Sequence, residues 1–182
     1  RPAENVSVVD ITSGYGVLGL MGPQSRTLLQ RLAESDLGRG VFPFGTMQEV
    51  MIAGAPVRVL RISFVGELGY ELHVPTEYLL TVFDALHDVG IEHDLVNAGY
   101  RAIDSLRLEK QFCAWGAEIG PDHSLLEAGL GFAADPNKTD FVGRDAVYAQ
   151  RSAPLKKKLA TFTITGDQPL LGGETIYRDG EV

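Results

Sequence analysis

The chain has 182 residues, a hydrophobic fraction of 45% and a formal net charge of -8. This length suits one domain, or one domain with part of a second, and the composition is that of a folded chain and not of a disordered tail. The acidic balance repels phosphate backbones and argues against non-specific binding of nucleic acid. No run of residues approaches the ~20 apolar positions of a membrane span, so no membrane partner is expected.

The first half of the chain has a pattern typical of an α+β domain. In chain order it predicts a strand at 16–21, a helix that opens at 22–25, strands at 47–53, 57–64 and 69–74, and a helix from Thr76 to about Val89. Thr76 is expected to cap the last helix and Gly90 to end it. Its core face is predicted to hold Leu79, Leu80, Val82, Phe83 and Leu86. The whole predicts a largely antiparallel sheet with ferredoxin-like strand and helix order.

The second half carries fewer regular elements. A helix at about 98–111 is predicted to gather Tyr100, Ile103 and Leu106 on one face, followed by a Gly-rich loop at 116–131, a short helix at 143–150 and a strand at 159–165. Asp104, Arg107 and Glu109 on the first of these helices have two open interpretations, a salt-bridge network or a binding site. No Gly-rich dinucleotide fingerprint lies between a strand and a helix, so FAD or NAD is not expected by that route.

Cysteine, histidine and the chain ends give further expectations. The single Cys113 has apolar neighbours, which predicts a structural thiol in an intracellular protein, and the four scattered histidines predict no metal site. Arg outnumbers Lys, which favours a bacterial cytoplasm over the mitochondrial matrix. The chain lacks an initiator Met, and almost nothing follows the hairpin turn at Asp179 and Gly180, so we expect a piece of a longer protein.

Two carboxylates stand out within residues 63–75. Glu67 lies between glycines in Gly66-Glu67-Leu68-Gly69, and Glu71 follows in the predicted strand. An exposed turn residue is the simplest interpretation of Glu67, and a strand Glu usually faces solvent. A buried Glu71 beside a flat heterocycle could instead accept hydrogen bonds from an amino-pyrimidine edge, whose adjacent donors suit two carboxylate oxygens. The sequence alone does not determine which face of the sheet carries Glu71.

Several segments together, in their order, resemble one family. Residues 63–75 resemble its central strand motif, 97–109 its following helix, and 124–131 with 141–146 its later loops. The family is that of the folate-binding aminomethyltransferases, or glycine cleavage T-proteins. The details resemble most the C-terminal part of sarcosine and dimethylglycine dehydrogenases. The resemblance implies a fragment of a multi-lobed T-protein-like domain, with residues 1–155 in its central part and residues 156–182 beginning a C-terminal β sub-domain.

The resemblance also implies a ligand and its contacts. Glu71 would bind tetrahydrofolate through its pterin, and Phe64 and Tyr100 would shape the pocket. Two positions depart from the family pattern: Phe64 stands where the family often has Tyr, and Ile103 where the free-standing transferase has Arg. Arg101 is the neighbouring candidate to compensate, although one helical position is ~100° away around the axis. The family's catalytic acidic residue lies before Arg1, so catalytic residues are not assigned here.

The expected function follows from that resemblance. An N-terminal FAD domain, outside this chain, would oxidise an N-methylated glycine, and this domain would transfer the one-carbon unit from an iminium to tetrahydrofolate. The small-molecule partner is then the N-methylated glycine or its iminium. Two alternatives stay open: a free-standing aminomethyltransferase of the glycine cleavage system, and a non-catalytic regulatory subunit with the same fold. The sequence gives no oligomeric state.

Overall fold

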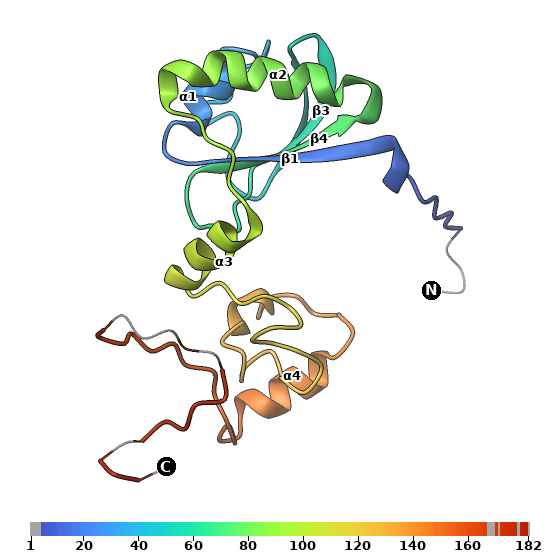
Figure 1. Ribbon diagram of the computed structural model, residues 1–182. Coiled ribbons are helices and arrows are strands. Elements are labelled where there is room, and N and C mark those ends of the chain that lie inside the picture. Colours follow the sequence, from blue (N-terminus) through green and yellow to red (C-terminus); the bar gives the residue numbers. More distant parts are fainter. Residues whose placement is uncertain (1–4, 167–169, 171, 178, 182) are drawn as a thin grey trace. The chain divides into compact units, whose positions relative to one another are not determined.

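The chain forms two compact units, Arg1–Ala114 and Trp115–Val182 (Figure 1). The computed structural model describes residues 5–166, 170, 172–177 and 179–181. In those ranges no helix has the length and apolar character needed to cross a lipid bilayer. The expected domain boundary near residue 155 concerns a longer protein and stays a prediction.

Unit 1 is built on a four-stranded antiparallel sheet. Its elements in chain order are η1 (Thr12–Gly14), β1 (Tyr15–Met21), α1 (Ser25–Gln30), β2 (Met47–Ile52), β3 (Ala55–Leu60), β4 (Gly69–Pro75), η2 (Thr76–Tyr78), α2 (Leu79–Gly90), η3 (Ile91–His93) and α3 (Tyr100–Glu109), where η marks a 3-10 helix. The strands lie in the order β1-β4-β3-β2, and each neighbouring pair is antiparallel. The predicted α+β class is therefore confirmed, as is the order strand, helix, three strands, helix.

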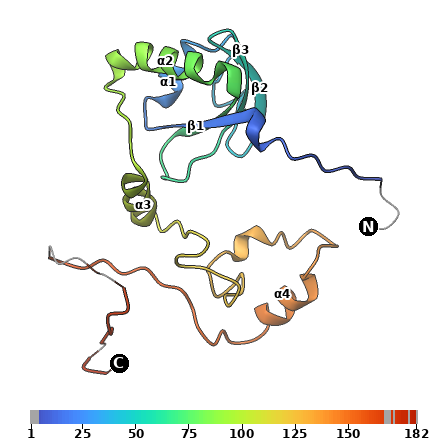
Figure 2. The same cartoon turned by 45° about the vertical axis from the view of Figure 1, so that its right-hand side comes forward.

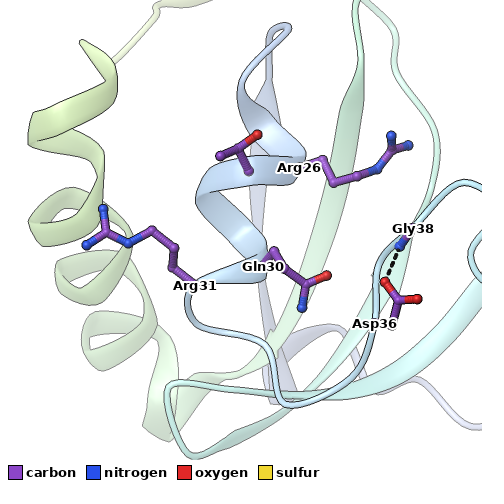
Figure 3. Close-up of a pocket in the computed structure, with 6 residues that line it drawn as sticks. Arg26, Gln30, Arg31, Asp36 and Gly38 are labelled. Carbon is purple, nitrogen blue, oxygen red and sulfur yellow. Dashed lines mark hydrogen bonds between the residues drawn. The ribbon is translucent and has the colours of Figure 1, made fainter.

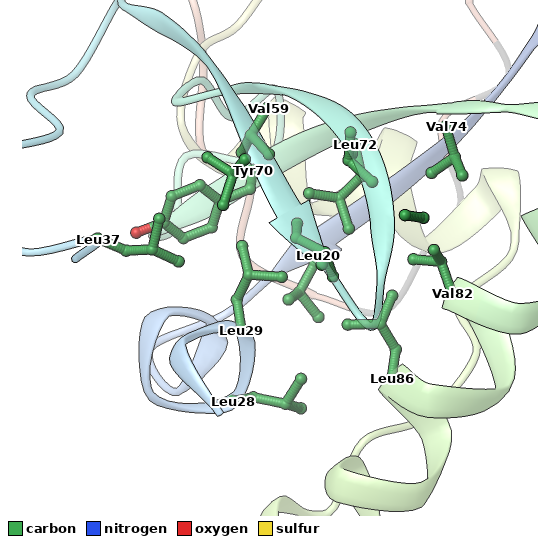
Figure 4. Packing of buried hydrophobic residues seen from close by; sticks show 14 of the residues in the cluster. Leu20, Leu28, Leu29, Leu37, Val59, Tyr70, Leu72, Val74, Val82 and Leu86 are labelled. Atoms are coloured by element: carbon green, nitrogen blue, oxygen red, sulfur yellow. The ribbon is translucent and has the colours of Figure 1, made fainter. Parts of the chain in front are cut away.

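One face of the sheet forms the hydrophobic core with α1 and α2. Tyr70, Leu72 and Val74 alternate along β4 and are fully buried, as the period of two predicts. Both helices lie on the same side of the sheet (Figure 2), and their side chains meet those of the strands in Figure 4. The buried cluster comprises Leu20, Leu28, Leu29, Leu37, Phe42, Val50, Ile52, Ala55, Val57, Val59, Tyr70, Leu72, Val74, Val82 and Leu86. Each such aliphatic side chain contributes roughly 1.5–3 kcal/mol by burial, so this cluster holds sheet and helices together.

Helix α2 begins later than predicted, and its buried face differs from the prediction. The turn at Thr76–Tyr78 is a 3-10 helix, and α2 starts at Leu79. Val82 and Leu86 are buried as predicted, but Leu80 is 69% exposed, so its predicted core position is wrong. Leu79 packs against the sheet beside Gly16, and a Cβ added at Gly16 would overlap the Leu79 side chain. Leu80 then points ~100° away around the helix.

The cap of this helix is a second correction. The Thr76 hydroxyl donates a hydrogen bond to the carbonyl oxygen of Ser13, 3.0 Å away, and caps no helix end. Thr76 lies inside η2, and the N-cap positions of η2 and α2 are held by Pro75 and Tyr78, so Thr76 is not placed to cap either helix. α2 ends at Gly90, close to the predicted end, but Gly90 has a helical φ of -72° and the chain continues into η3, so Gly90 is not the predicted stop residue.

Strand β3 ends earlier than predicted. It stops at Leu60, where its pairing with β4 also ends, although the backbone of Arg61 still bonds to Thr46 and Gly45. Phe64 therefore lies in the loop before β4 and not in a strand, contrary to the sequence-based expectation.

Helix α3 departs from its predicted apolar face. Tyr100 is exposed, Ile103 is half-buried, and the buried residue of the helix is Arg107. The Arg107 guanidinium donates to Asp104 Oδ1 at 3.2 Å and to the carbonyl oxygen of Phe112 at 3.1 Å. The predicted pairing of Asp104 with Arg107 is confirmed, whereas the apolar stripe is wrong because the helix packs through its arginine side instead.

Unit 2 contains η4 (Gly131–Ala133) and α4 (Arg144–Arg151), which confirms the helix predicted at 143–150. The strand predicted at 159–165 is wrong, since these residues form no strand. The Leu159 amide instead donates to the carbonyl oxygen of Glu127 at 2.8 Å, which binds this segment to a turn and not to a sheet.

Two remaining predictions concern the hairpin turn near the end of the chain and the environment of Cys113. Asp179 and Gly180 have φ values of 54° and 87°, as in the type I′ hairpin turn that the sequence predicts. The flanking Arg178 and Val182 lie outside the described residues, as do residues 1–4. Cys113 is half-buried, with its sulfur 3.9 Å from a backbone oxygen, so its surroundings are more open than the sequence predicted.

Candidate binding site on the open sheet face

The sheet has a second face, directed away from α1 and α2, that we call the open face. Alternation along the strands assigns to it Tyr15, Val17, Gly19, Met21, Met47, Glu49, Met51, Pro56, Arg58, Leu60, Gly69, Glu71 and His73. Val17 and Met47 are each 54% exposed. This face therefore combines charged groups with accessible apolar surface.

Glu71 lies in the middle of the open face. The strand register places it between Gly19 of β1 and Leu60 of β3. Its side chain is 32% exposed, so the carboxylate is half-buried. A Cβ added at Gly19 would meet only the Met21 side chain, at 3.6 Å. The missing side chain leaves a flat strip of backbone beside the Glu71 carboxylate, which a planar ring can approach.

One polar side chain, that of His73, lies close to this carboxylate. His73 Nε2 is 3.7 Å from Glu71 Oε2, and this nitrogen is buried without a hydrogen-bond partner among the described residues. Arg58 lies beside His73 in the register, but its Nε pairs with Glu49 Oε1 at 3.3 Å and its guanidinium stacks 4.9 Å from the centroid of the Tyr15 ring. Glu71 and His73 thus keep hydrogen-bonding capacity for a ligand, whereas Arg58 is already engaged.

The two glycines before Glu71 have identifiable structural roles. Gly66 has φ +76°, a left-handed conformation, and a Cβ there would also overlap the Lys110 side chain. A Cβ at Gly69 would overlap the side chain of Met21. Glu67 pairs with Lys110, Nζ to Oε1 at 3.2 Å, and is half exposed. It is therefore a turn residue held by an ion pair, as the sequence indicated.

The other predicted site residues are Phe64, Tyr100 and Arg101, and their surroundings differ from those of Glu71. Phe64 is 41% exposed, and the Arg107 guanidinium lies 6.0 Å from the centroid of its ring. Tyr100 and Arg101 are exposed at the start of α3. In the described part of the chain no hydrogen bond or ion pair joins these three residues to Glu71, and their role as cofactor contacts stays a prediction.

Sequence reasoning missed two residues of this site. His73 could have been found, because it lies two positions after Glu71 in a strand and therefore shares its face. Gly19 could not, because only the pairing of β1 with β4 brings it beside Glu71. The arrangement can bind a planar group that presents adjacent N–H donors to the two Glu71 oxygens. Among the residues that the structure describes, no group of three or more His, Cys, Asp or Glu is placed to hold a metal ion.

Comparison with known proteins identifies the family. Residues 1–138 match the family model described as GCVT N-terminal domain. The chain belongs to this family. The GCVT match includes all of unit 1 and therefore the whole open face.

Relatives of this GCVT domain include enzymes of several names. The chain is 46% identical over 176 residues to mouse mitochondrial sarcosine dehydrogenase and 39% identical over 180 residues to human mitochondrial dimethylglycine dehydrogenase. It is 35% identical over 176 residues to an aminomethyltransferase of Caldanaerobacter subterraneus subsp. tengcongensis. These alignments cover 96%, 98% and 97% of the chain. They confirm the resemblance that the sequence motifs indicated.

The relatives are longer than this chain. The alignments span 19% of the mouse dehydrogenase, 21% of the human one and 47% of the aminomethyltransferase. A solved chain of a heterotetrameric sarcosine oxidase from Corynebacterium sp. U-96 is 22% identical, with a TM-score of 0.45 over 53% of this chain and 48% of that one. That structural likeness is too low to add to the family assignment.

Proposed function

We propose that this chain is the folate-binding part of an FAD-dependent N-methyl amine dehydrogenase, with sarcosine or dimethylglycine as substrate, and that it takes part in one-carbon transfer to tetrahydrofolate. The names of the dehydrogenase relatives and their identities of 46% and 39% support this proposal. The observation that carries it is the position of Glu71, a half-buried carboxylate on a flat, accessible sheet face inside the matched family segment.

The geometry beside Glu71 suits a pterin. The amino-pyrimidine edge has adjacent N–H donors, and the two Glu71 oxygens can accept both of them. Gly19 leaves room for the ring to lie on the strand backbone, and His73 offers a further polar contact. Phe64, Tyr100 and Arg101 are the remaining proposed contacts; all three are accessible.

The chemical role of these residues is binding and orientation. Tetrahydrofolate, when bound, supplies the nitrogen that accepts the one-carbon unit. Glu71 would fix the orientation of the pterin, so that the reacting atoms meet in one geometry and not by free diffusion. A closed site would also keep water away from the reactive iminium. The catalytic acid is proposed to precede Arg1, outside this chain.

The remaining parts of the proposal concern the longer protein. The chain spans about a fifth of the length of the dehydrogenase relatives, and FAD would bind in a preceding domain. Residues 1–155 would lie in the centre of the aminomethyltransferase domain, with 156–182 beginning a further β sub-domain. A bacterial cytoplasm stays our predicted location, although the two dehydrogenases named above are mitochondrial.

Two alternatives have their own support. The 35% identity to an aminomethyltransferase favours a free-standing transferase, and an FAD domain encoded upstream in the same reading frame would exclude it. Phe64 and Ile103 depart from the family pattern and favour a non-catalytic binding subunit. The subunit would bind a reduced folate without turnover of an N-methylated glycine.

Calorimetry of the full-length protein with tetrahydrofolate tests the proposal. Glu71→Gln removes the charge but keeps the shape, and we expect it to weaken binding roughly 10- to 100-fold, as loss of a charged hydrogen bond predicts. Glu49→Gln is the matched control, because Glu49 lies on the same face and pairs with Arg58. Absence of binding by the wild type, or equal affinities of wild type and Glu71→Gln, would sink the folate assignment.

A further inference from the structure

A second site lies on the helix-covered side of the sheet, away from the open face. It is a shallow cavity of about 400 Å³ between α1 and the loop that follows it, lined by Arg26, Thr27, Gln30, Arg31, Asp36 and Gly38 (Figure 3). Cavities of a few hundred Å³ are of the size that holds small ligands. We call it the α1 pocket.

The wall of the α1 pocket is held by hydrogen bonds. The Gln30 side chain donates to the carbonyl oxygen of Ser35 at 2.9 Å and accepts from the amide of Leu37 at 2.7 Å. The Gly38 amide donates to Asp36 Oδ1 at 2.8 Å. Leu37 is fully buried and anchors the loop in the core. The pocket is therefore formed before any ligand arrives.

Two guanidinium groups without a carboxylate partner flank the buried Tyr70 ring, and of these only Arg26 lines the pocket. Arg26 Nε donates to the Tyr70 hydroxyl at 3.1 Å. The Arg61 guanidinium lies 5.2 Å from the centroid of the same ring, and Arg61 is 9% exposed. Arg61 donates to the carbonyl oxygen of Gly69 at 3.1 Å, and its Nε has no partner. Over the described ranges neither Arg26 nor Arg61 forms an ion pair with Asp or Glu.

The other arginine that lines the pocket, Arg31, behaves differently. Arg31 points away from Arg26 in Figure 3 and pairs with Glu92 at 2.6 Å, NH1 to Oε2. Its charge is already balanced. The uncompensated positive charge of the α1 pocket thus comes from Arg26, with Arg61 behind it.

These charges favour an anionic ligand, and a carboxylate over a phosphate. Arg61 is a buried cation without a carboxylate partner and Arg26 is half-buried, and an anion nearby would offset the cost of that charge. In an otherwise acidic chain, two such cations at one ring mark a local positive potential. A guanidinium fork matches a carboxylate in two parallel hydrogen bonds. The Asp36 carboxylate on the opposite wall would repel a doubly charged phosphate more than a singly charged carboxylate.

We propose that the α1 pocket binds a small monocarboxylate, with Arg26 as the residue that receives it. Arg61 supports the site through its charge behind Tyr70, without direct contact. This site is independent of the folate assignment, because it uses no residue of the open face.

An NMR titration of the full protein with acetate tests this proposal, with sodium chloride as the ionic-strength control. Acetate should shift the Arg26 Nε–H signal and the Gly38 amide signal in a saturable way, and chloride should not. Arg26→Gln should weaken the affinity at least ~10-fold, and Arg26→Lys, which keeps the charge but loses the fork, should weaken it less. Arg58→Gln, an arginine variant on the open face, should bind as the wild type does.

Three results would overturn the assignment. They are a lack of saturable shifts with acetate, unchanged acetate affinity in Arg26→Lys and Arg26→Gln together, or tighter binding of inorganic phosphate than of acetate. If Arg26→Gln fails to fold, Arg26→Lys alone decides, because it keeps the positive charge at the same position. Equal affinity of Arg26→Lys and wild type would then remove Arg26 from the site.

Discussion

Two leucines of α2 give a sharp test of the fold. Leu86 is 5% exposed and packs in the core cluster, whereas Leu80 on the same helix is 69% exposed. Replacing Leu86 by Ala removes buried carbon and leaves a partly collapsed cavity, which destabilises a protein by about 2–5 kcal/mol. Replacing Leu80 by Ala removes little buried surface, so we expect a change within about 0.5 kcal/mol. Both substitutions alter the intrinsic helix propensity equally, and this effect cancels in the comparison.

Urea denaturation followed by far-UV circular dichroism is the appropriate assay. All four strands and the helices α1 to α3 lie in unit 1, so this signal reports mainly the unit that carries both leucines. We expect the Leu86→Ala midpoint to fall by an amount that matches the free-energy loss, with an unchanged m-value. A difference below ~1 kcal/mol between the two variants, or a larger loss in Leu80→Ala, would refute the assigned orientation of α2.

Two further predictions concern a glycine and an acidic turn. Gly66→Ala should lose about 1–2 kcal/mol of stability in the same assay, because Ala is strained at φ +76°. Gly40→Ala is the control and should be neutral, because a Cβ at Gly40 meets open space and the residue has no positive φ. Equal losses of stability in the two variants would contradict this prediction. The backbone N–H of Ser124, with a further bond to its side chain, holds the pKa of Glu127 below its usual 4.5. Its stabilising contribution is complete above pH ~4.5 and is lost as the pH falls through the lowered pKa, so Glu127→Gln should flatten the acid transition of Trp115 fluorescence. Identical acid transitions in both proteins would argue against this role.

The sheet could be predicted from the sequence because its signals are local. Alternation at Tyr70, Leu72 and Val74 identifies a half-buried strand, and Gly54 marks the hairpin between β2 and β3. Leu80 was misplaced because two adjacent leucines begin α2, and successive helical positions lie ~100° apart, so only Leu79 shares the face of Val82 and Leu86.

Helix α3 shows another limit of sequence reasoning. Helical spacing predicted an apolar face of Tyr100, Ile103 and Leu106, but spacing cannot tell which side of a helix finds a neighbour. The neighbour is the loop at Phe64, reached by Arg107 through its ring contact. The strand predicted at 159–165 has β-prone residues but no partner strand in the described chain, and a strand is stable only when it is paired.

The candidate site was predictable only in part. The motif around Glu71 named this carboxylate as a candidate through the family resemblance, and its role as a folate contact stays a prediction. Its neighbour Gly19 depends on the pairing of distant strands, and the unpaired state of Arg26 and Arg61 depends on the positions of every carboxylate in the fold. Properties of this kind arise from the tertiary structure and have no local sequence signal.

The strand order has a consequence for how the open face is assembled. β2 and β3 meet through the tight turn that joins Ile52 to Ala55, whereas β1 pairs with β4 between residues as distant as Tyr15 and Pro75. Closing a long loop loses more chain entropy than closing a hairpin. Gly19 belongs to β1, so the surface beside Glu71 depends on the strand pairing with the larger entropic cost.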